Sequence, residues 1–285
     1  MDTSRLMMRG FDRAKMIGLI LGCALTVSAC DSMDRAESVR KMNDGLEALQ
    51  LGRTMDAVRD LKAAAQLDPT YAEPAYYLGQ IYHIKLSELE NAEQNYRQAL
   101  ERDPENPQIA YRLGSVLSDQ QAWSDAETFY QQAVQKDPEF AKAWFRLGLA
   151  QQMQNKWADA VESFTSSIKS NARMRMDEED PGGAAYHALG DIYIRFGFYD
   201  KALQVYENGI ENNDIDSRPL KPARLYQGKG VALLKAHKFA EAAQAFKKAL
   251  ELDGGMYTAV FNLAVANMAL NNTEAAVNGF NEFTQ

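Results

Sequence analysis

Apolar positions recur along residues 38–285 with the spacing of amphipathic helices, and polar stretches separate the segments. A small residue is followed twelve positions later by an alanine, or thirteen in the second case. The pairs are Gly45/Ala57, Gly79/Ala92, Gly114/Ala126, Gly148/Ala160, Gly190/Ala202, Gly230/Ala242 and Ala264/Ala276. Four positions after each alanine comes a large apolar residue: Leu61, Tyr96, Tyr130, Phe164, Tyr206, Phe246 and Phe280. Positions four apart share a helix face, so the pattern predicts an all-α chain of repeated helix pairs.

Each recurring position has a physical role in such a pair. The glycine lets the two helices approach closely, and the alanine sits where they cross. The large residue is expected to fill the gap to the next repeat. Asp-Pro closes the first three repeats at Pro69, Pro104 and Pro138, because proline cannot continue a helix.

This register resembles the tetratricopeptide-repeat (TPR) family, whose period is about 34 residues with two helices in each repeat. The resemblance implies a right-handed α-solenoid of about seven helix-turn-helix repeats over residues 38–285. The expected repeats lie near 38–71, 72–106, 107–140, 141–174, 183–216, 223–256 and 257–285. It also implies a concave groove lined by the first helix of each repeat.

Two connections are longer than the others, at 175–182 and 217–222, and both are polar and rich in turn residues. They are either tolerated insertions or loops that contact a partner, and the sequence leaves both interpretations open.

The first thirty residues are typical of a targeting segment. Basic residues precede an apolar run from Met16 to Val27, which is about 12 residues and too short to span a membrane. The stretch Val27-Ser28-Ala29-Cys30 resembles the bacterial lipobox, with valine where leucine is usual. The resemblance implies a lipoprotein signal peptide at 1–29, a lipidated Cys30 and a short tether at 30–37. An ordinary signal peptide is the alternative, and the choice between inner and outer membrane is open.

One register position of the first helices is expected to face the groove and reads Met42, Tyr76, Tyr111, Phe145, His187, Gln227 and Phe261. Aromatic anchors on a concave surface suit binding of a peptide. Tyr76, Tyr111, Phe145 and His187 are therefore candidate groove residues, although packing between first helices is an alternative. Arg112, Lys142 and Arg146 form a candidate basic patch, or else a solvated face. Lys142 and Arg146 match part of the family's carboxylate clamp, whose other positions are missing.

Composition excludes several function classes. The net charge of −8 argues against a general affinity for nucleic acid. Both cysteines lie in the first thirty residues, so the repeats hold no disulfide. The three histidines are far apart and lack metal-ligand spacing, and no catalytic or phosphate-binding motif occurs. We therefore expect no cofactor, no metal and no enzyme activity.

The signal and the repeats together favour a lipid-anchored scaffold that faces the periplasm and binds envelope proteins or peptides through its groove. Assembly of an envelope complex such as a pilus secretin is one process it would suit. A self-associating component of a motility, secretion or outer-membrane assembly complex is an alternative, with the C-terminal repeat as the adhesive end. Regulation of a separate cell-wall enzyme is another.

Overall fold

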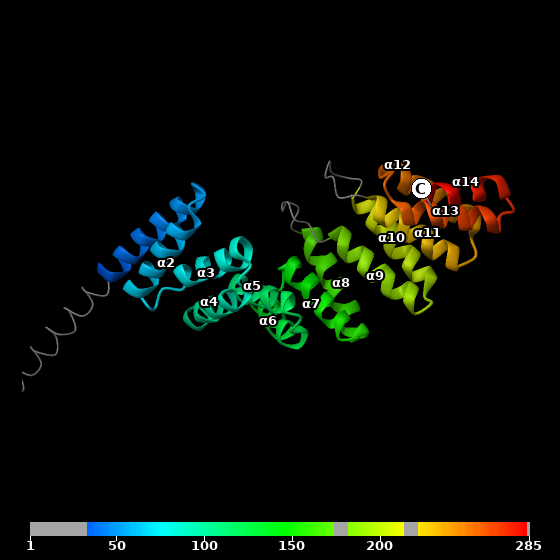
Figure 1. Cartoon of the computed structure of the whole chain (residues 1–285). Helices are drawn as coiled ribbons and strands as arrows, with labels where there is room; N and C mark the ends of the chain where they lie inside the picture. Colours follow the sequence, from blue (N-terminus) through cyan, green and yellow to red (C-terminus); the bar gives the residue numbers. More distant parts are fainter. Residues whose placement is uncertain (1–32, 174–181, 214–221, 284–285) are drawn as a thin grey trace, which may run out of the picture. The chain divides into compact units, whose positions relative to one another are not determined.

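The computed structural model describes residues 33–173, 182–213 and 222–283, and all regular secondary structure in those ranges is helical (Figure 1). The elements are a helix at 33–50, α2 (Thr54–Leu67), α3 (Ala72–Gln80), η2 (Ile81–Leu86), α4 (Leu89–Arg102), α5 (Pro107–Asp119), α6 (Trp123–Lys136), α7 (Ala141–Met153), α8 (Trp157–Arg173), α9 (Gly182–Arg195), α10 (Tyr199–Asn213), α11 (Pro222–Lys235), α12 (Phe239–Leu252), α13 (Tyr257–Ala269) and α14 (Thr273–Phe283). The predicted all-α repeat architecture is confirmed.

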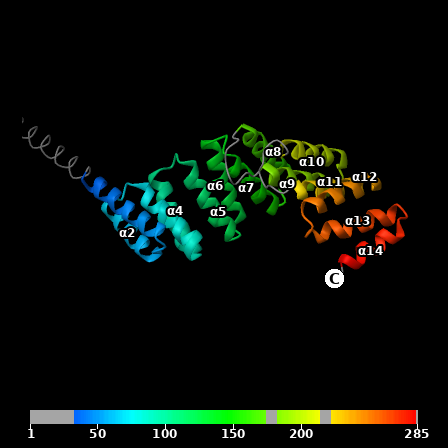
Figure 2. The same ribbon diagram turned by 90° about the horizontal axis from the view of Figure 1, so that it is seen from above.

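The chain forms two compact bodies, which meet in sequence between Gln120 and Gln121. We call them the N-terminal body and the C-terminal body. In the N-terminal body, each helix from α2 to α5 packs on the next. In the C-terminal body, the same holds from α6 to α14 (Figures 1 and 2). The first helices of successive repeats also touch there, because α11 contacts both α9 and α13.

The core is built from the recurring positions. The crossing alanines Ala57, Ala92, Ala126, Ala160, Ala202 and Ala242 are fully buried, and so are Leu61, Tyr96, Tyr130, Phe164, Tyr206 and Phe246. Ala276 and Ala264 of the last repeat are buried as well. Small residues at the crossing let the helices approach, and the large residues then fill the remaining space.

In several repeats, the large residue packs against the glycine of its own repeat. A Cβ atom added to Gly79 would lie 2.7 Å from the Tyr96 ring, and one added to Gly148 would lie 2.7 Å from Phe164. These rings therefore occupy space that the missing side chains leave open. The expectation that they fill the gap to the next repeat was incomplete, since these rings also pack against the glycine of their own helix pair.

Every turn between the two helices of a repeat contains one residue with left-handed backbone. These residues are Gly52, Ser87, Gln121, Asn155, Gly197, His237 and Asn271, with φ between 56° and 77°. A left-handed residue ends a helix and reverses the chain without a longer loop. Only two of these residues are glycine, which explains why the sequence did not reveal the position.

The second repeat contains a π-helix, η2, directly after α3. This is the repeat in which the glycine and the alanine are thirteen residues apart instead of twelve. Its left-handed residue, Ser87, is correspondingly eight positions after Gly79, whereas the others are seven after their glycine. The wider π turn absorbs one extra residue, so that the following helix keeps its register.

Several predicted features lie at or beyond the edge of the described residues. Cys30, the signal peptide and most of the two long connections, 175–181 and 217–221, are outside them. Residues 33–37, assigned from the sequence to a tether, are helical and continue to residue 50. Arg35 holds this helical start against the repeat, because it forms an ion pair with Asp68 at the end of α2. No helix among the described residues has the length and apolar character needed to cross a membrane.

Candidate functional site

Four side chains at the predicted groove position pack on the second helix of their own repeat and keep part of their surface exposed: Tyr76, Phe145, His187 and Phe261. The ring centroids are 5.9 Å apart for Tyr76 and Tyr96, and 5.8 Å for Phe145 and Phe164. The same contact joins His187 to Tyr206 at 6.2 Å and Phe261 to Phe280 at 5.6 Å. These side chains therefore have a structural role in addition to any contact with a partner.

Three predicted site residues lie close together in the N-terminal body. Arg112 of α5 has its guanidinium 5.8 Å from the ring centroid of Tyr111 and donates a hydrogen bond to the hydroxyl of Tyr76. Burial disfavours the charge, but this hydrogen bond raises the pKa of Arg112 above its usual value. Tyr111 is 9% exposed, so it is mainly a core residue.

The other predicted residues lie in the C-terminal body. Lys142, Phe145 and Arg146 are on α7, where Lys142 and Phe145 are half-buried and Arg146 is exposed. His187 is on α9. The predicted basic patch takes Arg112 from one body and Lys142 and Arg146 from the other. It stays a prediction.

His187 belongs to a chain of polar contacts that the sequence did not indicate. Its Nδ1 lies 3.0 Å from Oδ2 of Asp191, one helical turn later on α9. The hydroxyl of Tyr206 on α10 donates a 2.7 Å hydrogen bond to the other carboxylate oxygen, Oδ1. Burial, and then the Asp191 carboxylate, raise the pKa of the Tyr206 hydroxyl, so it remains a donor. Asp191 is thus held from two sides while its side chain is half-exposed.

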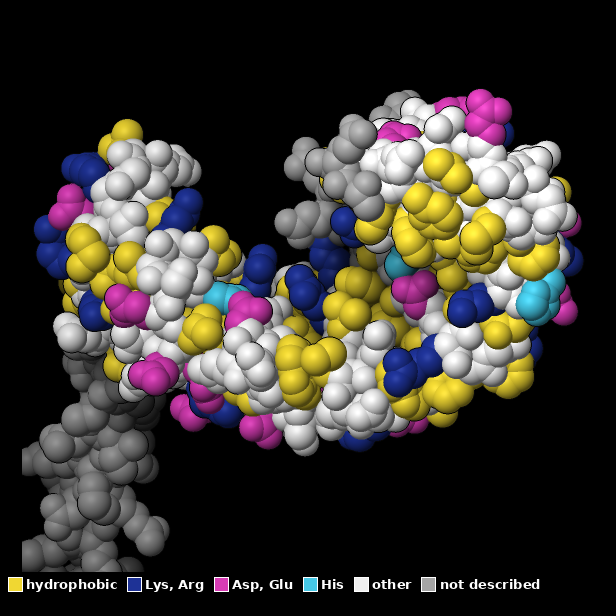
Figure 3. Space-filling view, turned by 45° about the vertical axis from the view of Figure 1, so that its right-hand side comes forward, with side chains coloured by type: hydrophobic (Ala, Val, Ile, Leu, Met, Phe, Trp, Pro, Cys, Tyr) yellow, Lys and Arg dark blue, Asp and Glu magenta, His cyan; other side chains and the backbone are white. Residues whose placement is uncertain are grey.

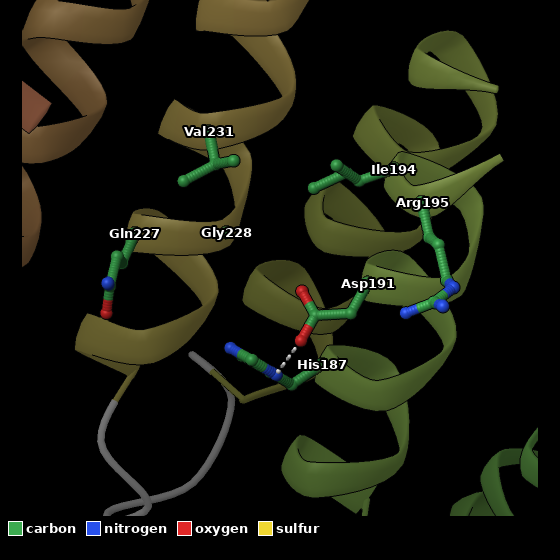
Figure 4. Close-up of a pocket in the computed structure, with 7 residues that line it drawn as sticks. All are labelled: His187, Asp191, Ile194, Arg195, Gln227, Gly228 and Val231. Carbon is green, nitrogen blue, oxygen red and sulfur yellow. Dashed lines mark ion pairs between the residues drawn. The ribbon is translucent and has the colours of Figure 1, made fainter. Parts of the chain in front are cut away.

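A pocket of about 330 Å³ opens beside these residues, between α9 and α11. From α9 it is lined by His187, Asp191, Ile194 and Arg195, and from α11 by Gln227, Gly228 and Val231 (Figure 4). The close-up shows His187, Asp191 and Ile194 directed toward α11, where Gly228 carries no side chain, and Arg195 running along its own helix α9. The face drawn in Figure 3 shows such a hollow in the C-terminal body, where apolar side chains border charged ones.

Apart from His187 and Gln227, which occupy the predicted groove-facing position, the sequence did not indicate the pocket residues, although one signal was available. Gly228 stands two positions before Gly230, where the other repeats carry Asn43, Tyr77, Arg112, Arg146, Ala188 and Asn262. The one repeat with glycine at this position is the repeat whose first helix, α11, lines one side of the pocket.

The described residues include no group of three or more His, Cys, Asp or Glu side chains that would hold a metal ion. The arrangement in the α9–α11 pocket suits contact with a polypeptide, because it combines apolar walls with a few oriented polar groups. The expectation that the chain is not an enzyme stays a prediction.

Comparison with known proteins gives one family. Models of the tetratricopeptide repeat match residues 43–107, 82–139, 111–181, 185–214 and 233–282. No curated protein matches the chain.

Several solved structures are similar. Pseudomonas aeruginosa PilF is 23% identical, with a TM-score of 0.58 over 78% of this chain and 94% of that one. A tetratricopeptide repeat protein from Parabacteroides merdae is 18% identical, with a TM-score of 0.59 over 87% of this chain and 93% of that one. YrrB, described as a TPR protein with an unusual peptide-binding site, is 20% identical, with a TM-score of 0.52 over 66% of this chain and 90% of that one. At these identities the likeness shows a shared fold.

Proposed function

Because the chain belongs to the tetratricopeptide-repeat family, a family of scaffolds for protein–protein interaction, we propose that it is a lipid-anchored scaffold of the bacterial envelope. In this proposal the acylated Cys30 holds the protein at a membrane, and the repeats face the periplasm. Their groove binds a segment of an envelope protein during assembly of a larger complex.

The observation that carries the binding role is the pocket between α9 and α11. Two successive first helices form it, which is where the family's groove is expected. Its polar groups are already held in place, with Asp191 fixed by Tyr206 and His187. A surface that needs little rearrangement loses less conformational entropy on binding. YrrB, with the same fold, is described as having a peptide-binding site.

The anchoring role rests on the sequence Val27-Ser28-Ala29-Cys30. Several acyl chains on one cysteine would give stable attachment, since each buried CH₂ contributes about 0.8 kcal/mol. The test is metabolic labelling with an alkyne analogue of palmitate in a bacterial host. Wild type and Cys23→Ser should carry label, whereas Cys30→Ser should carry none. Labelling of Cys30→Ser at the wild-type level would refute the anchor.

The groove role is tested by site-specific photo-crosslinking in cells. A photoreactive phenylalanine analogue replaces Gln227, which lines the pocket, or Lys247, which is exposed on the second helix α12. We expect a discrete crosslinked envelope protein from position 227 and none from position 247. Crosslinks of equal strength and identity from both positions would contradict recognition through the groove.

A further inference from the structure

The packing directly behind Gly228, which lines the pocket between α9 and α11, is tight. A Cβ atom added to Gly228 would lie 2.3 Å from the Tyr206 ring, and one added to Gly190 would lie 2.4 Å from the same ring. Tyr206 is therefore enclosed between the glycines of two successive repeats, and it is fully buried. This packing excludes a side chain at Gly228, so only the backbone of Gly228 lines the pocket.

Apolar and polar groups occupy separate parts of the pocket. Ile194 from α9 and Val231 from α11 supply its apolar walls. Both side chains are half-buried and pack against the core of the C-terminal body at their base. Burying them further under a partner's apolar side chain would therefore remove more surface from water without moving a helix.

The polar groups at the rim are held by contacts outside the pocket. The guanidinium of Arg195 lies 4.5 Å from the centroid of the Trp157 ring. The side-chain amide of Gln227 donates a 2.6 Å hydrogen bond to Oγ1 of Thr258. Together with Asp191, these residues present an acceptor, a cationic donor and an amide around one apolar cavity.

The two opposite charges at the rim give no net preference for a charged occupant, because a cation attracted by Asp191 would be repelled by Arg195, and an anion would meet the reverse. An extended peptide offers the complementary pattern, since its main chain carries both N–H donors and C=O acceptors. A volume of about 330 Å³ has room for one large side chain.

We propose that this pocket is a subsite for a single large apolar side chain, aromatic or long aliphatic, of an extended partner peptide. In this arrangement the side chain packs between Ile194 and Val231. Asp191 accepts a hydrogen bond from the peptide's main-chain N–H, and Arg195 donates one to a carbonyl. The inference rests on the proposed binding of a partner in the groove, and it adds the chemical class of the residue that is recognised.

The test uses the full mature chain and peptides selected from a random twelve-residue display library. Selected peptides are resynthesised with blocked ends, and their Kd is measured by fluorescence anisotropy. We expect them to share one large apolar residue, whose replacement by alanine raises Kd about ten- to hundredfold. Val231→Glu should raise Kd by a similar factor. With this variant, replacing the apolar residue of the peptide by alanine should change Kd very little.

Val265→Glu is the matched control, because Val265 occupies the same register on α13 and is also half-buried. Its Kd should stay within about twofold of wild type. If Val231→Glu fails to fold, Gln227→Trp fills the pocket from a half-buried position at its rim and should weaken binding in the same way.

Failure of the subsite and failure of the scaffold give different results. Peptides that bind without a shared apolar residue, or that bind both pocket variants as tightly as wild type, would overturn the subsite and leave groove binding intact. If no peptide binds while position 227 still crosslinks an envelope protein, the subsite fails and the scaffold stands. If neither peptides nor crosslinks are obtained, both proposals fail.

Discussion

At the scale of single residues, the fold depends on contacts between a glycine on one helix and a large ring on the next. Gly148 and Phe164 are one such pair, with 2.7 Å between an added Cβ and the ring. The pairing was partly visible in the sequence, because both positions recur in register. Sequence spacing alone did not show that the ring faces the glycine of its own repeat.

We expect Gly148→Ala to lower the free energy of unfolding by about 1–2 kcal/mol. The overpacking of Phe164 costs more than the roughly 1 kcal/mol that alanine contributes in a helix. Urea denaturation of the purified protein measures the change. Gly254→Ala is the control, since the nearest atom to its added Cβ is 3.8 Å away. If Gly148→Ala were as stable as the control, α7 and α8 would be able to move apart at little cost, and the account would be wrong.

The left-handed turn residues allow a prediction of opposite sign. Gln121 is exposed and has a φ of 63°. A side chain at such an angle costs about 1 kcal/mol, so Gln121→Gly should raise the free energy of unfolding by up to that amount. The neighbouring Gln120 has a φ of −78°, and Gln120→Gly should lower it. Equal effects of the two substitutions in urea denaturation would contradict this account.

At the scale of the elements, the end of a repeat is formed by an aspartate as much as by the following proline. The Asp68 carboxylate accepts a 2.9 Å hydrogen bond from the Thr70 N–H, and the Asp137 carboxylate accepts a 3.0 Å bond from the Glu139 N–H. Asp253 makes the same contact with Gly255, although glycine instead of proline follows it. The sequence drew attention to proline, and the repeating aspartate turn became clear only in the structure.

Asp68 should make the stability of the N-terminal body depend on acid pH. Burial opposes its charge, but hydrogen bonds from Thr70 and Arg35 lower the pKa of Asp68 to about 2. The unfolded value is about 3.9, so the stabilisation is complete above that pH and is lost as the pH falls toward about 2. Because Arg35 is half-exposed, we expect a contribution of about 1 kcal/mol or less.

The measurement is thermal unfolding of wild type and Asp68→Asn between pH 5 and pH 2. Asparagine keeps the turn hydrogen bond but does not titrate. The difference in stability between the two proteins should shrink as the pH falls. A difference that stays constant across this interval would remove Asp68 as the cause.

The extra residue in the π-helix η2 should make this segment tolerant of a one-residue deletion. Ile84 is 58% exposed and lies in the segment that absorbs the extra residue. Deleting it should convert the π turn to regular α-helix, with a loss of about 1 kcal/mol or less. Met153 occupies the matching register of α7 and is 56% exposed, but its repeat has no extra residue. Deleting Met153 should rotate α8 against α7. The resulting loss of stability, measured by thermal unfolding, should be several times larger than the loss on deleting Ile84. Equal losses would refute the interpretation.

At the scale of the whole molecule, the repeat number and the helical class followed from the sequence because they depend on many positions in register. The pocket did not follow, because it depends on one glycine and on side-chain directions. Gly228 and Asp191 lie in different repeats, 37 positions apart in the sequence, and packing of α9 on α11 brings them to one cavity.

The C-terminal repeat should be the first to open. Ala276 is the buried residue of α14, whereas Val277 and Phe283 are 50% and 42% exposed. Stability in a repeat protein comes from contacts between neighbouring helices and repeats, and among the described helices α14 packs chiefly on α13. We expect amide hydrogens of α14 to exchange faster than those of α12 in dilute protein. Protection of α14 that rises with protein concentration, and falls in Val277→Glu, would instead support the predicted self-association.

The enclosure of Tyr206 also has a mechanical consequence. Repeat arrays pulled from their ends generally lengthen one repeat after another, since each touches only its neighbours. Here the Tyr206 ring packs against both Gly190 and Gly228. The fifth repeat therefore cannot unfold without removing a packing contact from the sixth. Under tension in an optical trap, α9 to α12 are therefore expected to extend as a single step, twice the length of a one-repeat step.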